Sequence, residues 1–316
     1  MDEGKIEFLR VNRHFRNPMV TGQGTALSID RLLLRCYLKG KWGYGEIAPW
    51  PGFNTESIDE AIRAIEQSSH RYSTLLEILH DSPGTLPCLR AALFSCSHWE
   101  SISTFKGELS SAGLVTPFHA NTLQLKWAEG FTTLKGKITP STDIAEVRSW
   151  LTDLPASAKI RLDANGSLNI EQTHRWLDFI QDEKRVEFLE QPLPVNHEGY
   201  LYLPHDKVAL DESFLTPGAL SWKGVLIVKP LLAGDGLALL KWGQSHRGKR
   251  IYSSVFETAI GRQTALWLAA QDSPATVHGF DTLGRFQADR LDRHSGGPKT
   301  MGLPHFDWNL FWHEIK

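Results

Sequence analysis

Five charged side chains stand at the ends of five successive apolar segments in the middle of the chain. Three are acidic: Asp163 ends KIRLD, Glu190 ends VEFLE, and Asp211 follows KVAL. One lysine precedes this series, Lys137 in TLKGK, and another follows it, Lys229 in VLIVK. Each segment is short, rich in branched apolar residues and followed by a helix-like stretch, as in parallel barrels that carry polar side chains at the carboxyl ends of their strands. We therefore expect the three carboxylates to converge, with a lysine on either side.

The chemistry of this set follows from its ligand types. Three carboxylates without a His or Cys beside them form an oxygen site suited to Mg²⁺, for which Mn²⁺ can substitute, rather than to zinc. Such a cation stabilises the oxyanion that forms when a base removes a proton next to a carboxylate, and lysine is a suitable base. The alternative, that each acid only caps a helix and each lysine is solvated, requires five coincidences. We predict Asp163, Glu190 and Asp211 as metal ligands, with Lys137 and Lys229 as catalytic residues.

Three further polar side chains accompany the predicted site and are candidates for substrate binding. Lys135 lies two residues before Lys137 and so points to the same side of its strand, where it adds positive charge. Arg161, two residues before Asp163, either steers an anionic substrate or pairs with a neighbouring ligand. Asn165 either orients a metal ligand or is the turn residue of an Asn-Gly pair. The sequence leaves these alternatives open.

Several motifs of the chain resemble those of a known family. The segments LKGKI, RLDANGS, FLEQPLP, LDES and IVKP are similar to the strand motifs of the enolase superfamily, in its muconate lactonizing enzyme subgroup. Sites of this superfamily combine a Lys or His base with bound magnesium. Within the subgroup the chain most resembles the o-succinylbenzoate synthase family of menaquinone and phylloquinone biosynthesis, through GYGEIAPWPGF, SSVFETAIG and HGFDTLGRF. The resemblance spans nearly the whole chain.

The resemblance implies a reaction and a role for each group. The reaction is the syn-dehydration of 2-succinyl-6-hydroxy-2,4-cyclohexadiene-1-carboxylate to 2-succinylbenzoate, through an enediolate that magnesium stabilises. Lys137 would remove the proton next to the carboxylate and then protonate the departing hydroxyl, while Lys229 would hold the ring and the enediolate electrostatically from the opposite face. Ser253 and Ser254 would contact the succinyl group, although a serine before a helix is also a common cap.

The resemblance also implies an α/β fold, a TIM-like (β/α) barrel of the modified, enolase type with an α+β capping domain that the C-terminal tail completes. We expect the capping domain at 1–112, the barrel at 113–288, and the tail at 289–316. Two loops of the first part, bearing Gly22 and Phe53, are expected to close the barrel mouth and contact the substrate, or else to be ordinary turns.

Apolar patterning predicts the individual elements. Strands are expected at 4–12, 31–38 and 42–48, and helices at 55–68, 71–80 and 86–101. The barrel is expected to begin near residue 115 with TPFHAN and to end with RIYSSVF and TVHGF. The tail carries Trp308, Phe311 and Trp312, which make it too apolar for a free end and predict packing on the capping domain.

Composition excludes other classes of function. The chain has 34 basic and 36 acidic residues and a net charge of −2, with no basic stripe for nucleic acid and no polybasic membrane anchor. No apolar run is long enough to span a bilayer, and the start MDEGKIEF does not resemble a signal peptide. Its 3 cysteines show no CxxC spacing. We expect a cytoplasmic enzyme with a small carboxylate substrate, and the sequence does not predict its oligomeric state.

Two alternatives to the dehydration are kept. The first is another reaction of the subgroup: N-acylamino acid racemase, dipeptide epimerase or muconate cycloisomerase. Dipeptide epimerases tend to carry Asp-x-Asp on the eighth strand to hold the substrate ammonium, whereas this chain has only Asp281 in HGFDTLG. The second is a barrel that has lost catalysis and serves as a binding protein, which the five intact positions disfavour.

Overall fold

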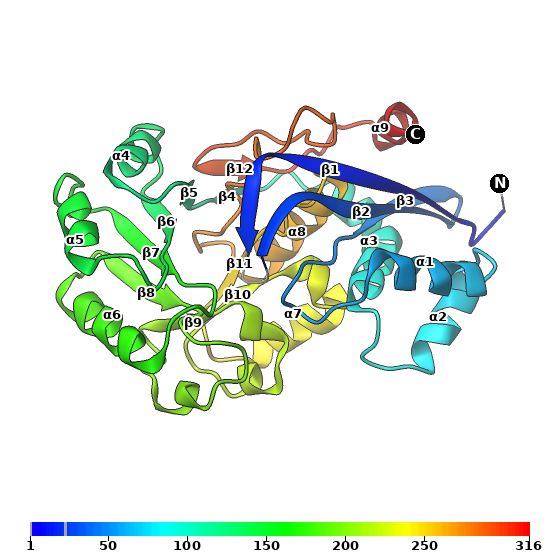
Figure 1. The fold of residues 1–316 in the computed structure, drawn as a ribbon. Coiled ribbons are helices and arrows are strands. Elements are labelled where there is room, and N and C mark those ends of the chain that lie inside the picture. The colour runs from blue at the N-terminus through cyan, green and yellow to red at the C-terminus, as the bar shows by residue number, and fades with distance from the viewer. Residues whose placement is uncertain (1, 22–23) are drawn as a thin grey trace.

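The computed structural model describes residues 2–21 and 24–316 (Figure 1). The N-terminal part is an antiparallel sheet in the order β1-β2-β3 followed by three helices. Its strands are β1 (Ile6–Thr21), β2 (Gly24–Leu38) and β3 (Lys41–Ile47), and its helices are α1 (Ile58–Gln67), α2 (Tyr72–His80) and α3 (Pro87–Ser103). All six predicted elements are present, but β1 and β2 are much longer than expected.

The extra length of β1 and β2 forms a hairpin that crosses from the capping helices to the barrel (blue in Figure 1). Near the helices the hairpin is buried, as at Leu32, whereas its far half is largely exposed. There Phe15 and Ile29 are buried in a small cluster with Phe286 of the barrel side, and Met19 and Ala26 pack against it while partly exposed. The sequence pattern missed this half because a strand buried at so few positions lacks clear alternation.

The second part is a curled parallel sheet in the order β11-β10-β9-β8-β7-β6-β5, so chain neighbours are also neighbours in space. Its strands are β5 (Gly113–Val115), β6 (Thr133–Lys137), β7 (Lys159–Asp163), β8 (Val186–Glu190), β9 (Val208–Leu210), β10 (Val225–Val228) and β11 (Arg250–Tyr252). The connecting α-helices are α4 (Ala120–Ala128), α5 (Ile144–Thr152), α6 (Ile170–Asp182), α7 (Gly236–Ser245) and α8 (Ala259–Asp272). Short 3₁₀ segments follow β8, β9 and β10: η1 (Glu198–Tyr202), η2 (Glu212–Leu215), η3 (Pro217–Leu220) and η4 (Pro230–Leu232). This is the expected modified TIM-like barrel.

Two details of the predicted barrel were wrong. The first strand ends at Val115 rather than continuing through TPFHAN, because Pro117 has no N–H for the ladder and the chain turns into α4. The last segment, TVHGF, forms isolated bridges instead of a strand. His278 pairs with Ser111 and Gly279 pairs with Ser253, and these bridges close the ring between β11 and the start of β5.

The C-terminal segment returns to the capping part. β12 (Lys299–Met301) pairs with β4 (Glu108–Ser110), and α9 (Trp308–Ile315) packs its aromatic side chains on the N-terminal core. The rings of Trp308 and Trp99 meet edge-on with their centroids 5.0 Å apart, and the ring centroids of Trp312 and Tyr44 are 5.9 Å apart. The predicted packing of the tail is present, while the domain boundaries themselves stay a prediction.

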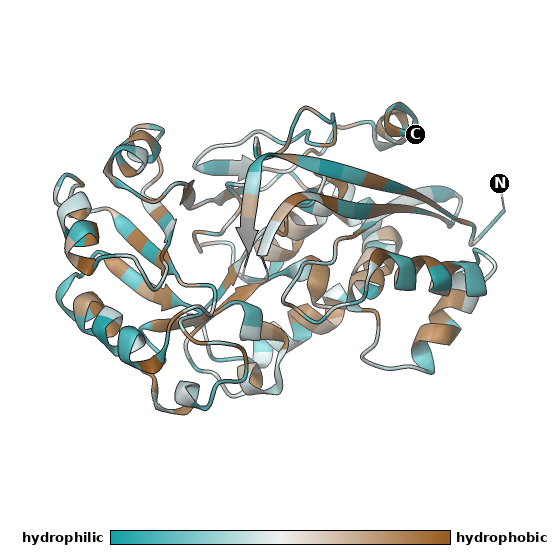
Figure 2. Cartoon of the chain, in the orientation of Figure 1, coloured by the Kyte–Doolittle hydropathy of each residue, from teal (hydrophilic) through white to brown (hydrophobic). Residues whose placement is uncertain are grey.

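Some of the helices follow from amphipathic segments, and α1 and α6 also have polar caps. Figure 2 shows α1, α2 and α6 with a hydrophilic and a hydrophobic face. Both α1 and α6 begin with a capping box, Ser57 with Glu60 and Asn169 with Gln172, which satisfies backbone N–H groups at the helix start. In the described part of the chain, none of the helices has the length and apolar character needed to cross a membrane.

Candidate active site

Three buried carboxylates meet at the carboxyl ends of neighbouring strands. Asp163 ends β7, Glu190 ends β8, and Asp211 directly follows β9. One oxygen of each lies within 4.8 Å of the others, and the three residues are 7%, 1% and 4% exposed. Parallel strands bring these ends to one edge, so the predicted convergence of the three acids is present.

The carboxylate cluster fits a divalent cation. Asp211 Oδ1 is buried and has no hydrogen-bond partner among the described residues. Burial and the neighbouring Asp163 raise the pKa of Glu190 to about 8, and burial raises the pKa of Asp211 to about 6. A cation held between one oxygen of each carboxylate would give Asp211 Oδ1 a partner. It would also favour the ionised form of all three carboxylates.

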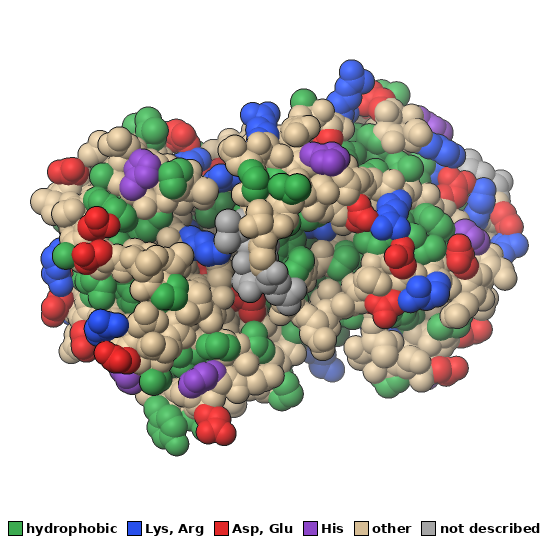
Figure 3. Space-filling view, viewed as in Figure 1, with side chains coloured by type: hydrophobic (Ala, Val, Ile, Leu, Met, Phe, Trp, Pro, Cys, Tyr) green, Lys and Arg blue, Asp and Glu red, His purple; other side chains and the backbone are tan. Residues whose placement is uncertain are grey.

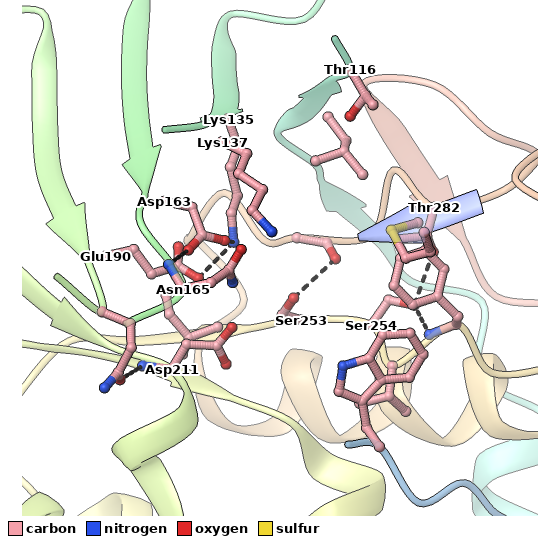
Figure 4. A pocket seen from close by; sticks show the side chains of 18 of the residues that line it. Thr116, Lys135, Lys137, Asp163, Asn165, Glu190, Asp211, Ser253, Ser254 and Thr282 are labelled. Atoms are coloured by element: carbon pink, nitrogen blue, oxygen red, sulfur yellow. Dashed lines mark hydrogen bonds and ion pairs between the residues drawn. The ribbon is translucent and has the colours of Figure 1, made fainter. Parts of the chain in front are cut away.

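Lys135 and Lys137 come from β6, the strand beside β7, and both line the same cavity (Figure 4). Lys135 Nζ lies 2.8 Å from Asp163 Oδ2 and 2.6 Å from Glu190 Oε1. Burial opposes the charge of Lys135, but these two carboxylates raise its pKa far above its usual range. Lys135 is therefore held by the carboxylates, and Lys137 lines the cavity at the end of the same strand.

Lys229 lies on the other side of the carboxylates, directly after β10. Its Nζ is 3.2 Å from Asp211 Oδ2 and donates a hydrogen bond to Ser253 Oγ at 3.1 Å. In the sheet, β7, β8 and β9 separate β10 from β6. The three acids thus lie between Lys229 and Lys137, in the arrangement that the sequence predicted.

The two polar residues near Asp163 have well-defined partners. Arg161 is buried, and its Nε lies 2.7 Å from Glu187 Oε2, so it pairs with a carboxylate outside the predicted ligand set. Asn165 has a positive φ of 44°, as a turn residue often has, and its backbone N–H donates to Asp163 Oδ1 at 3.0 Å. Its Nδ2 also donates to Glu212 Oε1 at 3.1 Å.

The remaining predicted substrate-binding residues differ in whether they line the cavity and whether their polar groups are already hydrogen-bonded. Ser253 and Phe53 line the cavity. Ser254 does too, but its hydroxyl donates to Glu257 Oε2 at 2.8 Å and accepts from Thr282 Oγ1 at 2.8 Å. Gly22 lies outside the described residues. The substrate contacts of these four residues stay predictions.

Sequence reasoning overlooked two residues that directly follow predicted metal ligands. Gln191 Oε1 accepts from the backbone N–H groups of Asp211 and Ser213 at 3.0 and 3.1 Å, which fixes the loop that bears Asp211. Glu212 is a second acid at this end of the barrel, and its Oε2 is buried without a partner among the described residues. The signal was present in FLEQP and LDES, as polar residues adjacent to the predicted ligands.

The site opens into a cavity of about 990 Å³ between the barrel and the β1–β2 hairpin. Figure 3 shows the molecule hollowed near its middle, with cationic side chains (blue) at the edge of the hollow. The three carboxylates, Lys135 and Lys137 lie on one side of the cavity (Figure 4). Met19, Trp50 and Phe256 form an apolar part, where the rings of Trp50 and Phe256 stack at 5.0 Å. The cavity can therefore hold a molecule with a charged and an apolar part.

Comparison with known proteins agrees with this geometry. The family described as "Enolase C-terminal domain-like" matches residues 119–221. The o-succinylbenzoate synthase of Thermosynechococcus vestitus is 29% identical over 289 residues, covering 84% of this chain and 88% of that protein. The o-succinylbenzoate synthase of Haemophilus influenzae is 27% identical over 270 residues, covering 76% and 78%.

Solved structures show the same relationship. An o-succinylbenzoate synthase from Thermosynechococcus elongatus, complexed with Mg in the active site, has a TM-score of 0.76 and 27% identity, covering 90% of this chain and 94% of that one. A dipeptide epimerase from Enterococcus faecalis, complexed with Mg and a dipeptide, has a TM-score of 0.79 at 20% identity, covering 96% and 99%. At that lower identity the likeness concerns the fold alone.

Fold, site and matches together show an enzyme with an enolase-type fold and a site for a divalent metal. It is similar to the o-succinylbenzoate synthases, and the two alignments above cover 84% and 76% of this chain. The alternative of a barrel that has lost catalysis is thereby set aside.

Proposed function

We propose that the protein is an o-succinylbenzoate synthase, a carbon–oxygen lyase of menaquinone or phylloquinone biosynthesis. It would remove water from 2-succinyl-6-hydroxy-2,4-cyclohexadiene-1-carboxylate and release 2-succinylbenzoate. The observation that carries this proposal is the similarity to synthases across both parts of the chain, at 27% to 29% identity. The placement of two lysines on opposite sides of three carboxylates supports it.

Lys137 is the proposed base because it lines the cavity at the end of β6, beside the strand of Asp163. It removes the proton from ring carbon 1, next to the carboxylate. The same lysine, now protonated, gives that proton to the hydroxyl leaving carbon 6, and the electrons of the broken C–H bond complete the aromatic ring. Proton and hydroxyl leave as one water, from the same face of the ring.

Asp163, Glu190 and Asp211 are the proposed ligands of Mg²⁺, with Mn²⁺ as a substitute. The cation would supply Lewis acidity to the substrate carboxylate. Lys229 is fixed by Asp211 and Ser253, so its ammonium stays on the side opposite Lys137. From there it stabilises the negative charge that develops when the proton is removed.

The structure gives a reason to prefer dehydration over dipeptide epimerisation. The epimerase interpretation needs free carboxylates at the last barrel segment to hold an ammonium. Asp281 Oδ2 instead lies 2.8 Å from Lys126 Nζ and accepts the backbone N–H of Leu114 at 2.8 Å. Because this carboxylate already has a cation, it is a poor partner for a second one.

We also propose the division into a capping domain at 1–112, a barrel at 113–288 and a tail at 289–316, and a cytoplasmic location. The capping domain would act as a lid, since β1 and the loop of Phe53 both contribute to the cavity wall. A small carboxylate is the proposed partner.

An ultraviolet assay tests the proposed reaction directly. Purified protein with Mg²⁺ is mixed with the cyclohexadiene carboxylate, and loss of the diene absorbance is followed. Rapid loss that EDTA abolishes and added Mg²⁺ restores is the expected result. If folded, magnesium-loaded protein leaves the diene unchanged while it racemises N-acylamino acids or dipeptides, the proposed reaction is wrong and another reaction of the superfamily takes its place.

A further inference from the structure

The cavity wall contains more positive charge than the proposed chemistry uses. Its cationic residues are Arg16, Lys135, Lys137, Arg161, Lys229 and Arg285. Lys135, Arg161 and Lys229 are paired with carboxylates, as described above. Arg16 and Arg285, in contrast, have no carboxylate within ion-pair distance in the part of the chain that the structure describes. Arg285 is half-buried and Arg16 is exposed. An arginine that lines a cavity without a counter-ion is a ready partner for an anionic ligand.

The two arginines lie together and are anchored through carbonyl groups. The backbone N–H of Arg16 donates to the carbonyl of Arg285 at 2.8 Å, and Arg16 Nε donates to the carbonyl of Phe286 at 2.7 Å. Arg285 Nη2 donates to the carbonyl of Leu114 at 3.2 Å. Each guanidinium has five N–H groups, so these bonds fix its position and leave other donors for a ligand.

The surroundings of Arg285 leave its charge only weakly compensated. Burial lowers the pKa of Arg285, and the charge of Asp281 opposes this lowering, but Asp281 is itself paired with Lys126. A carboxylate ligand would supply the missing counter-charge. Because such a bond is charge-assisted and partly shielded from water, it is stronger than an exposed ion pair.

The position of these arginines suits the far end of a dicarboxylate. Leu114, which Arg285 contacts, pairs in register with Lys135, so Arg285 lies beside the strand that precedes β6. Parallel strands are ~4.8 Å apart, so Leu114 on β5 and the Arg285 group bound to it lie roughly 10 Å from the end of β7 and roughly 14 Å from the end of β8. A carboxylate bound at the metal ligands of these strands leaves room for a ring and a four-carbon arm of ~5 Å, whose end then reaches the arginines.

The serines after β11 are less suited to this end of the substrate. Ser254 already bonds with Glu257 and Thr282, and Ser253 accepts from Lys229. A hydroxyl also carries no charge to balance a second carboxylate. We propose that Arg285, together with Arg16, forms a subsite for the distal carboxylate of a dicarboxylate substrate. For the succinyl arm in particular, the inference rests on the proposed function.

The test compares two ligands that differ only in the distal carboxylate. These are 2-succinylbenzoate and 2-butanoylbenzoate, which keeps the ring, its carboxylate and the keto group but ends in a methyl group. Their dissociation constants are measured by calorimetry with the Mg²⁺-loaded full chain. The variants are Arg285→Gln, Arg16→Gln and Arg285→Lys, with Arg175→Gln as control because Arg175 is an exposed arginine of α6 outside the cavity.

Wild-type protein is expected to bind 2-succinylbenzoate more tightly than 2-butanoylbenzoate. Arg285→Gln should weaken only the dicarboxylate, by roughly 10- to 100-fold, because a charged hydrogen bond is lost. Arg16→Gln should weaken binding of the dicarboxylate less, because Arg16 is exposed. Arg285→Lys should bind the dicarboxylate more tightly than Arg285→Gln does. Arg175→Gln should leave the dissociation constants of both ligands unchanged.

Three outcomes would overturn the subsite: equal weakening of both ligands in Arg285→Gln, no weakening of either, or wild-type protein that does not prefer the dicarboxylate. Turnover separates this inference from the proposed function. Diene consumption without an arginine-dependent preference contradicts the subsite alone. An arginine-dependent preference without diene consumption supports the subsite and contradicts the proposed reaction.

Discussion

Glu46 of the capping strand β3 caps helix α8 of the barrel through Thr258. Its carboxylate accepts the backbone N–H of Thr258 at 2.9 Å, the Thr258 hydroxyl at 2.6 Å, and the N–H of Gly261 at 3.0 Å. Thr258 is the N-cap residue of α8, but its own side chain does not cap the helix. The two parts of the chain are therefore joined by a buried, charged cap.

Replacing Glu46 by Gln should lower the free energy of unfolding by about 3 kcal/mol, because Arg31, buried 3.6 Å from Glu46, loses its carboxylate. Urea unfolding of wild type and Glu46→Gln measures the difference. Glu66→Gln, on the exposed side of α1, removes the same charge without this partner and should change stability by less than about 0.5 kcal/mol. Equal stability of both variants would show that the negative charge of Glu46 beside Arg31 contributes nothing.

Replacing Lys137 by Ala should reduce turnover of the diene by at least about 10³-fold, because no other group is proposed to move the proton. Folding, seen by circular dichroism, and Mg²⁺ binding should be unchanged. Lys159→Ala is the control, since Lys159 is exposed at the opposite end of neighbouring strand β7. A Lys137→Ala variant within tenfold of wild-type turnover would exclude this lysine as the base.

Replacing Gln191 by Leu should weaken Mg²⁺ binding about 10- to 100-fold. The amide of Gln191 holds the backbone of Asp211, and groups that orient ligands affect metal affinity by this amount. Calorimetric titration with Mg²⁺ gives the affinity, and the thermal midpoint without metal shows whether the variant is folded. An unchanged affinity in a folded variant would contradict the positioning role.

The stability of the protein should fall between pH 6.5 and about 4 because of His278. Its Nδ1 accepts the backbone N–H of Tyr252 at 3.0 Å and its Nε2 faces the carbonyl of Ser273 at 3.1 Å, which selects the neutral ring. Burial lowers the pKa of His278 from 6.5 to about 4. Below pH 6.5 the unfolded chain therefore binds a proton that the folded one does not, and stability is lost as the pH falls, by up to about 3 kcal/mol.

Substituting His278 by Asn tests this pH dependence, because Asn can still accept the Tyr252 N–H but does not titrate. Urea unfolding of both proteins at several pH values should show a flatter pH profile for the variant. His294, whose pKa burial lowers to about 3, contributes equally to both curves. Parallel curves for wild type and His278→Asn would rule out His278 as a source of the slope.

The site could be predicted because its side chains stand at fixed places in their own strands. Asp163 and Glu190 end apolar runs, and that local pattern already decides which edge of the sheet they reach. Contacts between distant segments could not be predicted in this way. The pairing of Arg161 with Glu187 and the carbonyl contacts of Arg285 depend on which strands become neighbours and on side-chain rotamers, and neither leaves a periodic signal.

In the fold, too, local elements could be predicted from the sequence, whereas contacts between distant segments could not. Helices α1 and α6 have clear polar caps in the sequence, whereas closure of the barrel does not. His278 and Gly279 complete the ring with isolated bridges, which need too few consecutive residues to produce strand alternation. The long hairpin was missed because its far half packs only against another part of the molecule, through Phe15 and Phe286.

The order of the strands has a consequence for how such an enzyme can change. The groups proposed to move the proton and hold the metal all belong to five neighbouring strands, β6 to β10, whereas Arg16, Phe53 and Arg285 enter the cavity from segments outside these strands. Substitutions in the second group can alter which acid fits without displacing the reacting groups. A new substrate preference therefore requires changes in a few loop and hairpin residues, while the inherited reaction step is kept intact.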